Sequence, residues 1–313
     1  MSVVLCVGHA VQDYIFRTPQ LPQRAEKYRA TGFFTQGGGP AATAAVTVAR
    51  LGGEARLVAR VGADPVADAL QQELERYGVD CRHVRRFTGH GSSVSSVFID
   101  DHGERLIVNH TDPQMPTECV WLDESVSLEG VSAVLADTRW PTGAEWALRS
   151  ARARGVPAVL DADTPVTSSS GLLEAATHLA FSLPGLRDID ASATDRDRAG
   201  VTLRQIAARH HVWCCVTLGA DGVLIADGRS SPGDSAGAAC ALQHVAACTV
   251  TAVDTLGAGD VWHGAFALAL AEGLDESAAV RAASATAALK VSRFGGRDAV
   301  PSRAERDLFM ETR

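Results

Sequence analysis

The sequence predicts an α/β fold: a three-layer sandwich with a mostly parallel central sheet and a small β-strand lid. Three observations support this fold class. Short β-branched runs alternate with longer stretches rich in alanine and leucine at helical period, the pattern of a parallel sheet covered by helices. The short runs are apolar on both faces, as strands buried under helices require. Two further segments break the alternation and resemble hairpins.

The regular elements follow from these patterns. Central strands are expected at Val3–Val7, Ala55–Val61, Ala133–Leu135, Pro157–Leu160 and Val212–Thr217. Helices are expected at Ala41–Leu51, Val66–Tyr77, Gly143–Arg154, Thr202–His210, Ala258–Glu272 and Glu276–Phe294.

The hairpin-like segments are Tyr14–Phe34 and Ser93–Val108, and Asp100–Gly103 supplies turn residues within the second. Strands that leave a covered core usually form a flap, so we expect a lid built from about residues 12–35 and 92–112. The sequence has no internal repeat and no linker long enough to divide it, and residues 1–313 are expected to form one domain. Gly228–Ala239, rich in glycine and serine, is expected to be a flexible loop.

Composition excludes several classes of protein. The 313 residues carry a formal charge of -8 with arginines scattered among acids, whereas a nucleic-acid groove needs a concentrated basic face. No apolar run approaches the roughly 18 residues of a membrane span, and the first strand has neither a basic leader nor a cleavage pattern. A cytoplasmic protein that binds neither nucleic acid nor membrane is expected. The seven cysteines include no C-x-x-C pair and are expected to be reduced.

Two common nucleotide sites are also excluded. A P-loop needs a lysine followed by serine or threonine, but the two lysines of this chain, Lys27 and Lys290, precede Tyr28 and Val291. The turn after the first strand, Gly8–Asp13, lacks the later glycines of a dinucleotide-binding turn.

The histidines do not show H-x-x-x-H spacing, which argues against a helical metal site.

The segment Val253–Asp260 carries the chemistry. It leads directly into an apolar helix, so the amides of Gly257, Ala258 and Gly259 should point outward at the positive end of the helix dipole and form an anion hole for phosphate oxygens. Asp260, in the first helical turn, should stay ionised and accept the proton of an attacking hydroxyl. The alternative is that Asp260 only caps the helix.

This segment resembles a known signature. Asp254–Asp260 matches the D-T-x-G-A-G-D pattern of the ribokinase (pfkB) family, and Gln36–Ala44 is similar to its glycine-rich N-terminal signature. Matching positions extend from Gly8 to the closing segment Arg293–Arg297. The resemblance implies a ribokinase-like fold, ATP and Mg²⁺ as cofactors, and transfer of phosphate to a sugar hydroxyl with Asp260 as the base.

On the sugar side, the resemblance implies that Asp13, at the end of the first strand, accepts hydrogen bonds from sugar hydroxyls. Gly37, Gly38 and Gly39 would let the sugar approach the backbone. The family usually has asparagine where this chain has Gly39, which removes one side-chain contact. The alternatives are a solvated turn residue for Asp13 and an ordinary loop for the glycines.

On the nucleotide side, Thr217, Gly219 and Gly222 belong to a segment similar to the one that lies along the ATP phosphates, together with Gly257 and Gly259. A β-hairpin turn is the alternative for the first three, and the two interpretations are compatible.

Two metal questions follow from the resemblance. Asp254 and the Thr255 backbone look like the family's monovalent-cation loop, which leaves a potassium requirement open. The family often carries an N-x-x-E motif near the phosphates, but Phe181–Leu186 retains neither residue. Magnesium is therefore expected to be held mainly by the nucleotide and water.

Within the family, the sequence looks most like bacterial sulfofructose kinases. The resemblance is carried by Gly37–Ala45, Leu135–Trp140, Phe181–Ser182 and Gly295–Arg297. It implies that Lys27, Asn109 and Arg139 surround the sulfonate of 6-deoxy-6-sulfofructose, a ketohexose-type sugar phosphorylated at its C1 hydroxyl. An ammonium, a guanidinium and an amide suit a monoanion with three acceptor oxygens. The alternatives are an exposed charge for Lys27, and for Arg139 a pairing with Asp137 or a neighbouring acid.

Other functions remain open. A fructose or fructose 6-phosphate kinase could use the same lid. A nucleoside kinase would stack its base on aromatic residues near the lid, such as Tyr14, Phe16, Phe33 and Phe34, although lid packing or a dimer interface explains them as well. A sugar sensor without activity would not need the base at Asp260. A homodimer that pairs through the lid is expected, because exposed strand edges favour pairing.

Overall fold

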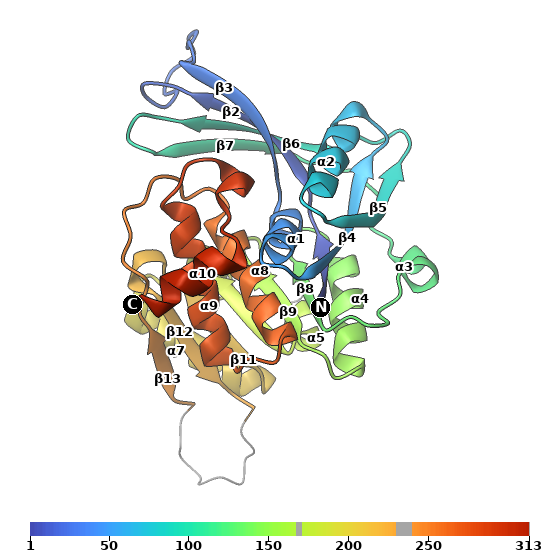
Figure 1. The fold of residues 1–313 in the computed structure, drawn as a ribbon, viewed down its shortest axis with the longest axis vertical. Helices are drawn as coiled ribbons and strands as arrows, with labels where there is room; N and C mark the ends of the chain where they lie inside the picture. Colours follow the sequence, from blue (N-terminus) through green and yellow to red (C-terminus); the bar gives the residue numbers. More distant parts are fainter. Residues whose placement is uncertain (167–170, 230–239, 313) are drawn as a thin grey trace.

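A computed structural model describes residues 1–166, 171–229 and 240–312, in which two β-sheets are arranged as a large body and a smaller sheet above one end of it (Figure 1). Within those ranges the strands are β1 Val3–Gly8, β2 Val11–Arg17, β3 Gly32–Gly38, β4 Glu54–Gly62, β5 Asp80–Phe87, β6 Ser93–Ile99, β7 Arg105–His110, β8 Ala133–Asp137, β9 Ala158–Ala162, β10 His178–Ser182, β11 Trp213–Thr217, β12 Val223–Asp227 and β13 Leu242–Val245. The helices are α1 Pro40–Arg50, α2 Pro65–Arg76, α3 Val120–Ser125, α4 Pro141–Ala153, α5 Leu172–Ala175, α6 Leu183–Ile189, α7 Arg196–His210, α8 Ala258–Ala271, α9 Glu276–Val291 and α10 Arg303–Glu311, with 3-10 turns η1 Gly219–Asp221 and η2 Gly296–Ala299.

The larger sheet has the strand order β13-β12-β11-β10-β9-β8-β1-β4-β5. The strands from β11 to β5 run parallel, and β12 and β13 add an antiparallel edge. Helices α1, α2, α8 and α9 pack on one face through one apolar cluster, and α3 to α7 pack on the other face through a second. The predicted three-layer α/β sandwich with a mostly parallel sheet is confirmed.

The predicted strands and helices are all present, with end positions shifted by a few residues. The larger differences are omissions. Strand β10, at the centre of the sheet, was not predicted, because its sequence, His178–Ser182, is short and begins with a histidine. Helix α7 begins at Arg196 rather than Thr202, because Asp195 caps it by accepting a hydrogen bond from the Arg198 amide.

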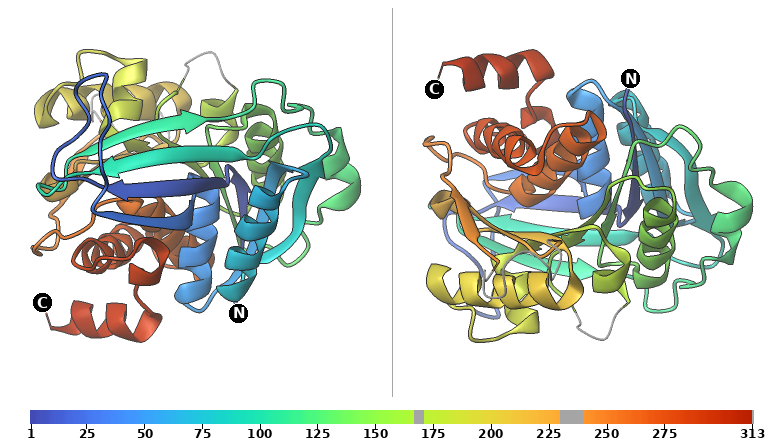
Figure 2. Two further views of the ribbon diagram at one scale, coloured as in Figure 1. Left: turned by 90° about the horizontal axis from the view of Figure 1, so that it is seen from above. Right: turned by 90° about the horizontal axis from the view of Figure 1, so that it is seen from below.

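The smaller sheet has the order β3-β2-β6-β7. In the view from above, it extends across the face of the molecule nearest the reader (Figure 2, left). Strands β2 and β3 pair antiparallel, as do β6 and β7, while β2 and β6 run parallel. Both hairpin-like segments therefore belong to one sheet. Of the loop expected at 228–239, residues 230–239 lie outside the described residues.

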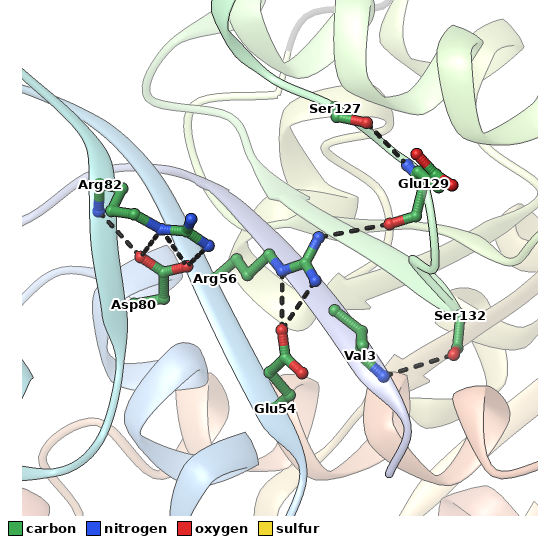
Figure 3. Close-up of polar contacts among 8 residues, drawn as sticks. All are labelled: Val3, Glu54, Arg56, Asp80, Arg82, Ser127, Glu129 and Ser132. Carbon is green, nitrogen blue, oxygen red and sulfur yellow. Dashed lines mark hydrogen bonds and ion pairs between the residues drawn. The ribbon is translucent and has the colours of Figure 1, made fainter.

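Polar contacts are made near the amino ends of the parallel strands β1, β4 and β5 (Figure 3). Arg56 donates hydrogen bonds to Glu54 at 2.7 and 2.9 Å and to the Glu129 carbonyl at 3.4 Å. The Val3 amide donates to the Ser132 hydroxyl at 3.3 Å. The carboxyl ends of these strands lie at the opposite end of the sheet, which is where α/β sheets usually bind their ligands.

The seven cysteines are free, and four of them are buried. Among the helices of the described ranges, none combines the length and the apolar character needed to cross a bilayer.

Candidate active site

Two cavities meet at the turn that opens helix α8. The first, of about 570 Å³, lies between the smaller sheet and the carboxyl ends of the central strands, and its lining includes Gly257 and Asp260. The second, of about 490 Å³, is lined by Ala258 and Gly259 together with the β11–β12 turn. One short stretch of backbone is thus the wall between two ligand-sized spaces.

Gly257 has φ of 72° and accepts a hydrogen bond from the Val261 amide at 3.0 Å, so it starts α8 in a backbone conformation that favours glycine. No side chain caps this helix. Within the described ranges, the amides of Gly257 and Gly259 have no hydrogen-bond acceptor, whereas the Ala258 amide donates to the Thr255 carbonyl at 3.3 Å. Two of the three predicted amides are therefore available to an anion, and the third is already engaged.

Asp260 is half-buried in the wall of the first cavity. Burial raises its pKa to about 7, and the nearby carboxyl group of Asp161 adds to this effect, while His263 opposes it. Burial and Asp161 shift Asp260 toward its protonated form, against the helix dipole that was expected to keep it ionised, so at neutral pH the carboxyl group is only partly ionised. A carboxyl group with a pKa close to neutrality remains suited to general-base chemistry.

A buried pair lies near Asp260. His263 follows it by one turn of α8, and its Nδ1 is 3.4 Å from Asp161 Oδ2 at the end of β9. Neither His263 Nδ1 nor Asp161 Oδ1 has a hydrogen-bond partner among the residues that the structure describes. Burial raises the pKa of Asp161 well above its usual range and lowers that of His263. Both shifts favour neutral forms, which limits the charge buried beside Asp260.

Asp13 lies within β2 rather than at the end of the first strand as expected, and it faces the first cavity. Burial raises its pKa to about 6, against the opposing effects of Ser95 and Arg297. A Cβ atom at Gly38 would lie 2.3 Å from Asp13 Oδ2, so any other residue there would displace the Asp13 carboxylate. Gly39 has φ of 95° and precedes helix α1. Gly37, Gly38 and Gly39 all line the cavity.

Sequence reasoning missed the contacts of two charged residues beside this glycine loop, one of which, Arg297, also lines the cavity. Arg297 is buried and donates to the Gly38 carbonyl at 2.8 Å and to Glu73 at 3.0 Å. Glu73, from α2, accepts a hydrogen bond from the Gly37 amide at 2.7 Å. The family resemblance of Gly295–Arg297 included this arginine but did not indicate what it contacts. Glu73 gave no signal in the sequence, because it looks like any other polar residue on the exposed face of an amphipathic helix.

The structure brings together two of the three residues predicted to surround a sulfonate. Asn109 and Arg139 line the first cavity, but Lys27 is exposed between β2 and β3 and does not. Arg139 Nη2 is 3.3 Å from Asp163 Oδ2, the pairing with a neighbouring acid that was the alternative. Asn109 donates to the Ser95 hydroxyl at 3.1 Å.

The second cavity is lined by the predicted nucleotide residues other than Gly257, which lines the first cavity. Thr217, Gly219 and Gly222 line it, and η1 connects the antiparallel strands β11 and β12 there, so this segment is both a hairpin turn and a cavity wall. A Cβ atom at Gly222 would lie 2.2 Å from the Val245 carbonyl. Mostly apolar walls with exposed backbone groups near a helix N-terminus fit a nucleotide whose phosphates reach the α8 turn.

Of the two residues considered for a monovalent cation, Asp254 pairs with a lysine of the protein and Thr255 faces the second cavity. Thr255 lines the second cavity, and the Asp254 carboxylate is 3.1 Å from the ammonium of Lys290. Where N-x-x-E was missing, Ser182 caps α6 by accepting from the Gly185 amide at 2.9 Å and donates to Asp163 at 2.6 Å. Over the described ranges, no cluster of three or more histidine, cysteine or acidic side chains is arranged to hold a metal ion.

Comparisons with known proteins agree with this geometry. A family model described as pfkB family carbohydrate kinase matches residues 1–303. The ribokinase of Bacillus subtilis is 26% identical over 306 residues, which cover 97% of this chain and 98% of that protein.

Solved structures share the fold. A crystal structure of a candidate ribokinase from Agrobacterium tumefaciens has a TM-score of 0.88 and 36% identity, covering 99% of this chain and 98% of that chain. Arabidopsis thaliana ribokinase, solved with ribose and ATP, has a TM-score of 0.83 at 21% identity, with coverage of 99% and 98%. The fold is therefore that of the ribokinases.

Proposed function

The chain belongs to the pfkB family of carbohydrate kinases, and on that premise we propose that it transfers the γ-phosphoryl group of ATP to a hydroxyl group of a sugar bound in the first cavity. Family membership makes it a phosphotransferase with an alcohol group as acceptor. The observation that carries the proposal is the α8 turn, which lines both cavities and would face a phosphoryl group passing from one to the other.

In the proposed reaction the sugar hydroxyl oxygen forms a bond to the γ-phosphorus, the bond to the bridging oxygen breaks, and ADP leaves. Asp260 takes the hydroxyl proton, which its pKa of about 7 allows. The free amides of Gly257 and Gly259 stabilise charge on the transferring oxygens. Asp13 and the glycine loop orient the sugar.

For the nucleotide, Thr217, Gly219 and Gly222 would lie along ATP in the second cavity. Magnesium would neutralise phosphate charge and be held mainly by the nucleotide and water, in keeping with its preference for retaining a water shell.

We also propose that the sheet β3-β2-β6-β7 acts as a lid, built from about residues 12–35 and 92–112, that closes over the sugar and excludes water. The sheet supplies one wall of the first cavity, through Asp13, Ser95 and Asn109 among others. Phe33 and Val108, which do not line the first cavity, are 58% and 60% exposed on this sheet, which supports pairing of two lids in a homodimer.

The sugar we propose carries an anionic group, with 6-deoxy-6-sulfofructose phosphorylated at C1 as the first candidate. Arg139 and Asn109 in the cavity support this proposal, and lid closure would have to bring Lys27 to the same point. The competing candidate is ribose, because the relatives are named ribokinases. Fructose and fructose 6-phosphate complete the set to be tested.

The nucleoside alternative is less well supported. The first cavity has aliphatic side chains from the lid sheet, Val97 and Ile107 among them, and its lining does not include Tyr14, Phe16, Phe33 or Phe34. Phe16 packs against Phe33 and Phe98 instead, with ring centroids 5.0 and 5.4 Å apart. Among the described residues, the lining of this cavity includes no phenylalanine, tyrosine or tryptophan on which a base could stack.

The test is ADP release with ATP and Mg²⁺ in the presence of sulfofructose, ribose, fructose, fructose 6-phosphate and a nucleoside, with Asp260→Asn as control. Sugar-dependent ADP release that Asp260→Asn loses supports the kinase, and the order of kcat/KM values identifies the sugar. Equal rates in the two proteins would retire the proposal and favour a sensor without activity.

A further inference from the structure

Lys290 is a buried lysine at the end of helix α9, and it contacts the wall of the proposed active site. Its side chain is 1% exposed, and the chain has only one other lysine, Lys27. Its Nζ lies 2.9 Å from the Asp254 carbonyl oxygen and 3.1 Å from Asp254 Oδ2. An ammonium is rarely buried in this way without a specific partner.

The residue it contacts is firmly placed just before the Gly257 turn. Asp254 Oδ1 accepts a hydrogen bond from the Leu256 amide at 3.0 Å, and Oδ2 accepts one from the Gly296 amide at 3.3 Å. The amides of Val253 and Asp254 donate to the Val291 carbonyl at 2.7 and 3.1 Å. The end of α9 therefore holds the segment that leads into the proposed anion hole.

This arrangement does not fit a monovalent cation at Asp254. Such an ion needs carbonyl and carboxylate oxygens as ligands, and the Asp254 carbonyl oxygen and Oδ2 already accept from the Lys290 ammonium. A potassium ion there would be a second positive charge beside a buried one. The loop that resembles a cation site holds a cation from the protein itself.

We propose that Lys290 is a positioning residue whose tethered ammonium takes the place of a monovalent cation, so that phosphoryl transfer by this chain does not depend on potassium. The inference rests on the proposed kinase function. The ammonium carries the same single charge as potassium and donates to the same oxygens, but it cannot dissociate from the site. It holds Asp254 in place, and Asp254 holds the backbone that presents the Gly257 and Gly259 amides.

The first test uses the unaltered protein, with sugar-dependent ADP release and thermal melting measured in KCl and in tetramethylammonium chloride at equal ionic strength. The same rate and the same melting temperature in both salts are expected. Acceleration or stabilisation by KCl would overturn the proposal.

The second test uses Lys290→Met, which empties the site while keeping an apolar stem in the helix. A shift of the glycine turn by about 1 Å can lower the rate by about 100-fold, and a loss of that order is expected without potassium. KCl should recover part of the rate and raise the melting temperature of the variant by mass action, because the ion then binds only the folded protein.

The matched control is Arg281→Met, which removes one positive charge from an exposed position of the same helix and should leave the rate and the response to salt unchanged. A purely structural Lys290–Asp254 pair predicts a folded Lys290→Met protein whose rate and melting temperature ignore KCl, and that outcome rejects the proposal. If Lys290→Met does not fold, the unaltered protein alone decides the question. If the proposed kinase function is wrong, no sugar-dependent ADP release is seen in either salt. The melting temperatures still show whether potassium binds at the Lys290 site.

Discussion

Arg297 and Glu73, 224 positions apart in the sequence, form an ion pair at 3.0 Å beside the glycine loop of the first cavity. One partner holds the Gly38 carbonyl and the other holds the Gly37 amide. The pair therefore anchors two backbone groups of the loop at the wall of this cavity, which Arg297 also lines, and it joins helix α2 to the turn after α9.

Breaking this pair should destabilise the fold. Arg297 and Glu73 have side chains that are 2% and 13% exposed, so Arg297→Met leaves the Glu73 carboxylate with little solvation and without the positive charge that balances it, although the Gly37 amide still donates to it. The free energy of unfolding should fall by about 3–5 kcal/mol, measured by urea denaturation. Arg198→Met, which breaks an exposed pair with Asp195, should cost about 0–1 kcal/mol. Equal losses in the two variants would contradict a supporting role for Arg297.

The pH dependence of the reaction should report Asp260. Its pKa is raised to about 7 by burial and by Asp161, and only its ionised form can accept a proton. Therefore kcat/KM for the sugar should rise with pH through neutrality and then level off. Asp260→Asn should lower kcat by about 10²–10⁴-fold, the usual contribution of a general base. A flat profile across neutral pH would argue against Asp260 as the base.

Asp260 should also make the stability of the fold depend on pH, and stability should fall with rising pH where the rate increases. The folded pKa of about 7 lies above the ordinary value of about 3.9, so the folded protein binds a proton that the unfolded chain releases between these two pH values. The stability associated with Asp260 is present at acid pH and is lost as pH rises through about 7. Asn cannot titrate, so the melting temperature of Asp260→Asn minus that of the unaltered protein should increase over this range. A constant difference would mean that Asp260 has an ordinary pKa.

Arg139 should determine preference rather than catalysis. It lines the first cavity with a guanidinium that is one-third exposed and paired with Asp163. Arg139→Ala should reduce kcat/KM for sulfofructose and fructose 6-phosphate by about 10-fold or more, as expected for a charge-assisted contact, and leave the rates for neutral sugars nearly unchanged. Arg149→Ala, which removes an exposed pair with Glu145, is the matched control. An equal loss for charged and neutral sugars would refute this role.

The close approach at Gly38 should be needed for sugar binding. A methyl group there would overlap Asp13 Oδ2, so Gly38→Ala should raise KM for the sugar while KM for ATP, bound in the other cavity, stays the same. Gly91→Ala, at a position with open space around the added Cβ atom, is the control for a glycine-to-alanine change. Steady-state kinetics with each substrate varied in turn provides the check, and a parallel rise in both KM values would count against separate cavities.

The sequence by itself determined the alternation of strands and helices, the two-hairpin sheet and the glycine turn before Asp260. These features depend on local chemistry: apolar periodicity, turn residues, and the conformational freedom of Gly257 at positive φ. Local patterns failed at β10, whose His178–Ser182 run is a strand only because β9 and β11 flank it.

The tertiary structure decided the electrostatics of the site. It placed Asp161 of β9 near Asp260, Glu73 behind the glycine loop, and the Lys290 ammonium at the Asp254 oxygens where a free cation was considered. Burial and Coulomb interactions depend on distance in space, and parallel strands joined by helices bring together residues far apart in the sequence. The residue types of the site could therefore be predicted, but their protonation and their partners could not.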